Sequence, residues 1–206
     1  MGGVERPDKS DTCASQPLED ARLSFEKLVE KATRGDQDAL CSLCEKIARS
    51  VLFQVTHLLG GRQEDAEDVS QEVLVRVCGN IGSLRSPKAF KVWLSRIIIN
   101  EKNRYLTKKI KGSEVLNIED YLENIAEDND DFLPQECAES AELRSAVMGI
   151  IDRLSIRQRE AVLLYYYEGL SVTQVAEAME VTIQGASRHL AIAREKLRRE
   201  LKSPSL

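Results

Sequence analysis

Residues 65–76 read Asp-Ala-Glu-Asp-Val-Ser-Gln-Glu-Val-Leu-Val-Arg, and they carry more information about the fold than any other stretch. Ala66, Val69 and Val73 recur at intervals of three and four residues, which places them on one side of an α-helix. The carboxylates and the amide lie elsewhere on the helix. They suit a basic protein partner, because Arg and Lys pair with carboxylates directionally. The alternative is an ordinary solvated helix surface.

Signals for the starts and ends of helices recur along the chain. Asp36 and Ser86 are placed to begin two helices, and Gly35 is placed to end another. Capping boxes at residues 155–158 and 171–174 predict two more helix starts near the C-terminus. No segment shows the alternating pattern of a β-strand, so the chain is expected to be all-α.

The charges are unevenly distributed along the 206 residues, although the net charge is only −5. Residues 76–111 contain ten Lys and Arg against a single Glu101, whereas residues 114–142 contain many acids and neither Lys nor Arg. This asymmetry indicates contact with a polyanion beside a solvated acidic linker. The apolar stretches are shorter than the ~20 residues that a membrane span needs, and residues 1–10 do not resemble a signal peptide. We therefore expect a cytoplasmic protein without membrane insertion.

The cysteines offer a competing interpretation. Cys41 and Cys44 form a C-x-x-C pair, which could indicate zinc binding or redox chemistry. His57 and His189 are the only histidines, and each is isolated, so we expect small buried thiols and neither a metal nor a cofactor. No catalytic set of residues can be assembled, and we expect that the protein is not an enzyme.

Two helical domains are predicted from these patterns. Residues 1–18 are expected to form a disordered lead-in, 19–111 the first domain, 112–138 an acidic flexible linker and 139–202 the second domain. One hypothesis is that the linker folds against the basic surface of residues 88–111 and suppresses DNA binding by the free protein.

The second domain has the pattern of a helix-turn-helix. A short helix from residue 171 to 179 is followed by a break at residues 180–182 and a longer helix with an apolar side. Gln184 and Arg188 lie opposite that side; Gln suits adenine, and Arg suits guanine or phosphate.

Three strings resemble extracytoplasmic-function (ECF) sigma factors of the sigma-70 family. Residues 65–76 are similar to the helix with which these factors bind RNA polymerase. Residues 90–104, with Asn100 and Arg104, resemble the segment of sigma region 2 that recognises and opens the −10 element. The matches within residues 154–198 resemble sigma region 4, which reads the −35 element. The chain departs from the family in three places: Glu180 stands where Gly is common, Gly185 and Ala186 where Thr-Val is usual, and Ile192 where Arg is common. These departures leave the expected fold unchanged but leave the base preference open.

The resemblance implies partners and site residues. The partners would be bacterial core RNA polymerase (β′ clamp and β flap), promoter DNA and an anti-sigma factor, with a monomer in the free state. The residues implied for polymerase binding are Asp65, Glu67, Asp68, Gln71 and Glu72. Those implied for the −10 element are Arg85, Ser86, Lys88, Asn100, Lys102, Arg104, Lys108 and Lys109. Those implied for the −35 element are Arg157, Ser171, Thr173, Gln184, Ser187, Arg188, His189 and Arg194.

Two other functions remain open. A stand-alone DNA-binding regulator would use only the helix-turn-helix, but it would have no use for the acidic helix. A sigma-like protein that binds polymerase without opening DNA is the second alternative, and promoter-specific transcription would separate it from a sigma factor.

Overall fold

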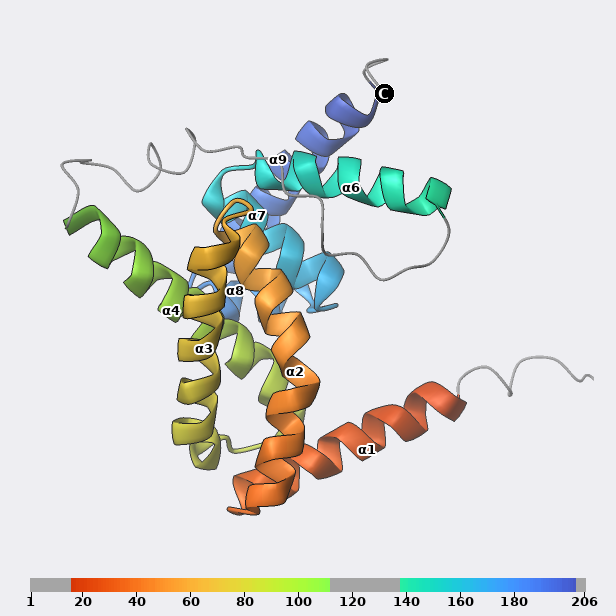
Figure 1. The fold of residues 1–206 in the computed structure, drawn as a ribbon. Coiled ribbons are helices and arrows are strands. Elements are labelled where there is room, and N and C mark those ends of the chain that lie inside the picture. Colours follow the sequence, from red (N-terminus) through yellow and green to blue (C-terminus); the bar gives the residue numbers. More distant parts are fainter. Residues whose placement is uncertain (1–15, 112–137, 203–206) are drawn as a thin grey trace, which may run out of the picture.

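The structure is a computed structural model and describes the backbone of residues 16–111 and 138–202. All regular structure in these two ranges is helical (Figure 1), which confirms the predicted all-α fold. Apart from Ala138, the predicted acidic linker lies outside the described residues. The hypothesis that this linker folds against residues 88–111 therefore also concerns residues outside the described ranges. Helix α1 begins at Gln16, within the predicted lead-in.

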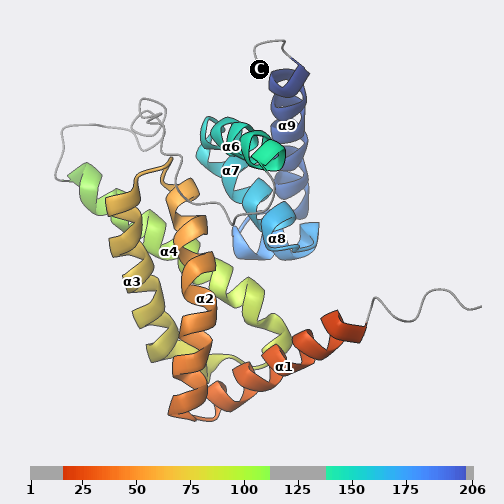
Figure 2. The same cartoon turned by 45° about the vertical axis from the view of Figure 1, so that its right-hand side comes forward.

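Four helices form an N-terminal unit. They are α1 (Gln16–Thr33), α2 (Gln37–Leu58), α3 (Gln63–Asn80) and α4 (Phe90–Lys111). Helices α2 and α3 lie side by side, and α4 crosses behind them (Figures 1 and 2). The apolar stripes of α2 and α3 are buried where the helices meet, so hydrophobic burial holds the unit together.

Local signals account for most of the helix boundaries in this unit. The Asp36 carboxylate accepts a hydrogen bond from the backbone N–H of Ala39 at 3.0 Å, as the sequence predicted. Ser86 makes no such cap. The helical segment nevertheless starts where predicted, with Ser86 before it and Pro87 at its first position, but its first turn, Pro87–Ala89, is 3₁₀ and continues directly into α4 at Phe90.

The C-terminal unit contains α6 (Ala138–Asp152), α7 (Ile156–Val162), a π-helical turn (Leu163–Tyr167), α8 (Val172–Ala178) and α9 (Ile183–Lys202). The capping box of Ser171 with Gln174 is present, as predicted. The one predicted for Ser155 is wrong, because the Ser155 side chain makes no cap hydrogen bond.

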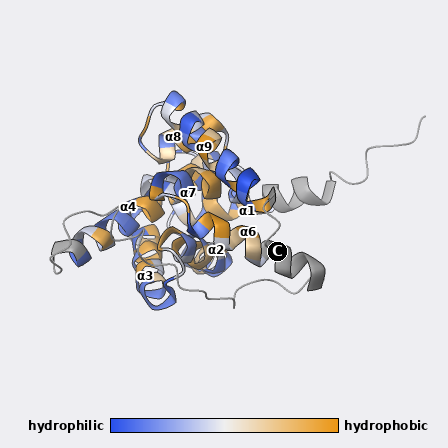
Figure 3. Cartoon of the chain, turned by 90° about the horizontal axis from the view of Figure 1, so that it is seen from above, coloured by the Kyte–Doolittle hydropathy of each residue, from blue (hydrophilic) through white to orange (hydrophobic). Residues whose placement is uncertain are grey.

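The two units pack directly on each other. Helix α4 lies against α8, and α2 lies against α6 and α7 (Figures 1 and 2). Hydrophilic residues cover the outer sides of α3 and of the later turns of α4 (Figure 3). Of the helices described here, none is long and apolar enough to span a membrane.

Candidate functional site

Helix α3 presents an acidic surface, which we define as Glu67, Asp68, Gln71 and Glu72. All four side chains are exposed, and none makes an ion pair within residues 24–109 or 145–201. They are exposed because the opposite side of α3 is held in the core, where it buries Ala66, Val69, Ser70, Val73 and Val77. Val75, which is 64% exposed, adds apolar area one turn beyond Gln71. This mixture of carboxylates and apolar area suits a protein partner with basic residues.

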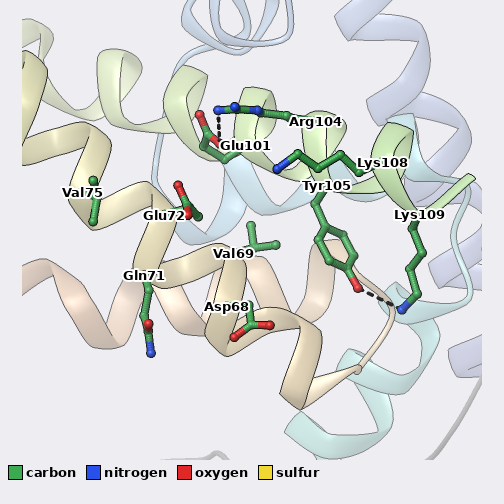
Figure 4. A pocket seen from close by; sticks show the side chains of 10 residues that line it. All are labelled: Asp68, Val69, Gln71, Glu72, Val75, Glu101, Arg104, Tyr105, Lys108 and Lys109. Carbon is green, nitrogen blue, oxygen red and sulfur yellow. Dashed lines mark hydrogen bonds and ion pairs between the residues drawn. The ribbon is translucent and has the colours of Figure 1, made fainter. Parts of the chain in front are cut away.

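A cleft of about 630 Å³ is lined by residues of both α3 and α4 (Figure 4). Asp68 and Glu72 line it from α3, and Arg104 and Lys108 line it from α4. The Arg104 guanidinium points toward Glu101, at 3.7 Å. Acidic and basic groups thus line opposite sides of one cleft, so the predicted polymerase and DNA surfaces are neighbours.

Asp65 is not part of the free acidic surface. Its carboxylate accepts a hydrogen bond from Lys109 Nζ at 2.6 Å, and Lys109 also donates to the Tyr105 hydroxyl at 2.9 Å. Burial alone would raise the pKa of Asp65, but the hydrogen bonds from Lys109 and Tyr105 outweigh it and lower that pKa. Asp65 was predicted to bind polymerase and Lys109 to bind DNA, but in the structure they pair with each other.

The residues predicted for the −10 element are placed in two ways. Most lie on the surface of α4, of the 3₁₀ turn Pro87–Ala89 or of the residues just before that turn. Ser86 is half-buried among these, and the exposed ones are Arg85, Lys88, Asn100, Arg104 and Lys108.

Lys102 differs from this set and corrects the prediction. Its side chain is 1% exposed, and its Nζ donates to Glu160 of α7, whose side chain is fully buried. An exposed phosphate contact was expected, but the packing of the C-terminal unit on α4 covers Lys102 in this arrangement.

The predicted reading surface, which we define as Gln184, Ser187 and Arg188, lies on the second helix of the helix-turn-helix. Gln184, Ser187 and Arg188 are exposed on α9, while Ala186 and Leu190 are buried beneath them. Recognition helices place exposed side chains of this kind in the DNA major groove.

The remaining residues predicted for the −35 element surround α9. Ser171 and Thr173 are exposed, and His189 is half-buried. Arg157 is exposed but lies 3.1 Å from Glu160, and the Arg194 Nε donates to the Tyr166 hydroxyl at 2.7 Å. Ser171 and Arg194 thus already have structural roles.

Sequence reasoning missed Tyr105 and Glu160. Tyr105 lies four residues before Lys109, a spacing that brings side chains together on a helix and could have indicated the contact. Glu160 gave no local signal, because its partner Lys102 is far away in the sequence.

The cysteine predictions need correction. Cys41 is exposed and Cys44 is half-buried, so the prediction of small buried thiols is wrong for Cys41. The Cys44 Sγ lies 3.5 Å from the Sγ of Cys78 on α3. Burial, together with the neighbouring Cys78, raises the pKa of Cys44 to about 12. Within the part of the chain that the structure describes, no cluster of metal-binding side chains is found.

Each of the two units matches a known protein family. The family described as Sigma-70 region 2 matches residues 43–111, and Sigma-70, region 4 matches residues 144–197. Together they cover more than half of the chain, in this order.

Curated proteins and solved structures agree with this assignment. The chain is 26% identical to the ECF RNA polymerase sigma factor SigW of Bacillus subtilis, over 87% of this chain and 98% of that protein. It is 29% identical to the ECF RNA polymerase sigma-E factor of Haemophilus influenzae, over 87% of this chain and 96% of that protein.

Two solved complexes share the fold. CnrH in complex with the cytosolic domain of CnrY matches with a TM-score of 0.59 at 21% identity, over 88% of this chain and 99% of that one. The sigma factor RpoE in complex with the anti-sigma factor NepR from Bartonella quintana matches with a TM-score of 0.61 at 19% identity. The match covers 78% of this chain and 95% of that one. The chain belongs to the sigma-70 family of RNA polymerase sigma factors, in its extracytoplasmic-function group.

Proposed function

We propose that this protein binds bacterial core RNA polymerase and directs transcription from promoters whose −10 and −35 elements it recognises. Membership of the family implies polymerase binding and promoter recognition in general. The proposal goes further and assigns each step to particular surfaces of this chain.

The observation that carries the proposal is the exposed acidic surface of α3 in the same chain as an exposed reading surface on α9. Asp68, Gln71 and Glu72 offer directional acceptors for a basic patch on the β′ clamp. Gln184 and Arg188 offer base and phosphate contacts for the −35 element. A regulator that binds DNA alone would need only the second of these surfaces.

The −10 element would be bound by α4 and the turn before it. Asn100 carries both donor and acceptor groups, and Arg104 and Lys108 are exposed cations that can follow a single strand. The loop of residues 82–86, which contains Arg85 and Ser86, would form the pocket for an unstacked base. Strand opening would then be driven by binding to the separated strand, while the polymerase performs the chemistry.

Transcription from genomic DNA tests this function, because every promoter of the source organism is then present in the assay. Core polymerase would be supplied with fragmented DNA from that organism, with and without the protein, and the 5′ ends of the transcripts would be sequenced. We expect new start sites that share two upstream elements. A variant with Gln184→Ala and Arg188→Ala should lose the starts that depend on the upstream element, since each good base contact contributes about 1–3 kcal/mol.

Binding to polymerase without new start sites would contradict promoter-directed initiation and favour a sigma-like protein that does not open DNA. A control variant with Arg198→Ala removes an exposed α9 cation that pairs with Glu195, outside the reading surface. Its start sites should match those of the unaltered protein.

A further inference from the structure

Helices α2 and α3 bring together two cysteines that the proposed function does not use. A short turn joins these two helices, so the start of α2 lies beside the end of α3 (Figure 1). There the Sγ atoms of the free thiols Cys44 and Cys78 are in contact at 3.5 Å, although the residues are 34 positions apart in the sequence. A disulfide bond is about 2.0 Å long, so the two sulfur atoms need to approach by only about 1.5 Å to form one.

The two thiols differ in their surroundings. Cys78 is exposed, and the space beside the neighbouring Gly79 is open, because a side chain added there would meet nothing within 4 Å. Cys44 is half-buried and packs against the core. Burial, the hydrogen bond with Cys78 and the charges that Cys78 and Cys41 carry as thiolates raise the pKa of Cys44 to about 12. Since oxidants react with thiolates, a small oxidant meets Cys78 first, with Cys44 held beside it as a second thiol.

The position of Cys78 gives its oxidation a consequence for α3. Cys78 follows the exposed Val75 by three residues and Gln71 by seven, so all three lie on one side of the helix. Cys78 therefore lies about 10 Å along the helix axis from the acidic surface. Oxidation to a sulfinic or sulfonic acid would place a permanent negative charge there, whereas a disulfide can be reduced again by thiols.

We propose that Cys44 and Cys78 form a redox modification site, at which a hydroperoxide oxidises Cys78 and Cys44 then closes a reversible disulfide between α2 and α3. With hydrogen peroxide, the Cys78 thiolate attacks one oxygen, the O–O bond breaks, and the leaving hydroxide takes up a proton to become water. Cys78 is then a sulfenic acid. The Cys44 sulfur attacks the Cys78 sulfur, the S–O bond breaks, and the leaving hydroxide takes the Cys44 proton. Two thiols are oxidised to a disulfide, and the peroxide is reduced to two molecules of water.

The first step prepares the second. Once Cys78 is a neutral sulfenic acid, it no longer carries the thiolate charge that opposes ionisation of Cys44, so the pKa of Cys44 falls. The disulfide then ties the start of α2 to the end of α3, the helix that carries the acidic surface. Because the sulfur atoms are already in contact, the cross-link keeps that surface in place.

Peroxide treatment of the full-length protein tests the site without polymerase or DNA. Cys13 and Cys137, which lie outside the described residues, are first replaced by Ser, so that Cys41, Cys44 and Cys78 are the remaining cysteines. The reduced protein is treated with a slight excess of hydrogen peroxide, free thiols are blocked with an alkylating reagent, and peptides are mapped by mass spectrometry. We expect a disulfide that joins Cys44 to Cys78, an unoxidised Cys41 and full reversal by dithiothreitol.

The melting temperature and two variants give further readouts. The disulfide should raise the melting temperature by roughly 5–15 °C, because it closes a long loop in the unfolded chain. Cys41→Ser is the matched control: it removes an exposed thiol one turn before Cys44 and should form the same disulfide with the same rise. Cys44→Ala leaves Cys78 without its partner. Cys78 should then be trapped as a sulfenic acid by a 1,3-diketone reagent and proceed to sulfinic acid, with no rise in melting temperature.

A disulfide between Cys41 and Cys44, or between the Cys78 residues of two chains, in place of the one between Cys44 and Cys78 would overturn the inference. Oxidation of Cys78 to sulfinic acid as readily with Cys44 present as in Cys44→Ala would also overturn it. So would free thiols at both positions after treatment. The last result needs no variant, so it decides the question even if Cys44→Ala does not fold.

Discussion

Asp65 and Lys109 show how single residues divide between structure and function in the cleft of α3 and α4. Both were predicted to serve external partners, yet they are joined at 2.6 Å with Tyr105 beside them. The 22% exposure of Asp65 and 35% exposure of Lys109 leave the pair partly shielded from solvent. The pair therefore links the start of α3 to the end of α4 and fixes one end of the cleft.

Replacing Asp65 should have an effect on stability that depends on pH. A carboxyl whose pKa is lowered by folding contributes stability above its unfolded value, near 3.8, and loses it as the pH falls through the lower folded value. Asp65→Asn should therefore reduce the free energy of unfolding by up to about 1 kcal/mol near pH 7. The difference should shrink toward zero in strongly acidic solution.

Urea unfolding at several pH values measures this difference. Glu64→Gln is the control, because Glu64 is an exposed carboxylate in the same first turn of α3. A deficit in Asp65→Asn that stays constant down to the lowest pH would mean that the ion pair with Lys109 is not its cause.

At the scale of helices, the two capping boxes predicted from sequence give a direct comparison. Ser171 accepts from the Gln174 backbone and Gln174 from the Ser171 backbone, at 3.3 and 2.9 Å. Ser155 has the same sequence pattern but makes no cap hydrogen bond. The local pattern thus identifies where a helix can start but not whether the cap forms.

Ser171→Ala should lower the free energy of unfolding of the C-terminal unit by about 1 kcal/mol, because it removes the acceptor for an N-terminal backbone N–H. Ser155→Ala should lower it by much less. Circular dichroism in a urea titration measures both variants side by side. Equal losses would show that the difference in capping does not control stability.

Helix patterns in the sequence predicted the order of the elements, the buried stripe of α3 and the exposed reading surface of α9. Each of these depends on spacings of three and four residues, which are local. The turn after α8 was less predictable. Its position at residues 180–182 was predicted, but its backbone conformation was not: Glu180 adopts a φ of +55°, in the left-handed region that Gly occupies without strain.

At the scale of the whole molecule, the closed packing of the two units could not be predicted from sequence. Lys102 and Glu160 are separated by 58 positions, and each looks like an ordinary surface charge when read locally. Only tertiary structure shows that both are buried against each other. The predicted set of −10 contacts consequently included one residue that this arrangement covers.

An equilibrium binding titration with labelled protein tests whether the acidic surface of α3 binds core RNA polymerase. The triple variant Asp68→Ala/Gln71→Ala/Glu72→Ala should bind at least about thirty-fold more weakly, since interface residues of this kind contribute roughly 2 kcal/mol or more in total.

The matched control is Gln37→Ala/Asp38→Ala/Glu45→Ala, which removes one amide and two carboxylates from exposed positions of α2. It should bind like the unaltered protein. Tight binding by the unaltered protein and the control, with loss in the α3 variant, is the predicted result. Equal affinity of all three proteins, or no binding by the folded unaltered protein, would show that the acidic surface of α3 does not bind core RNA polymerase.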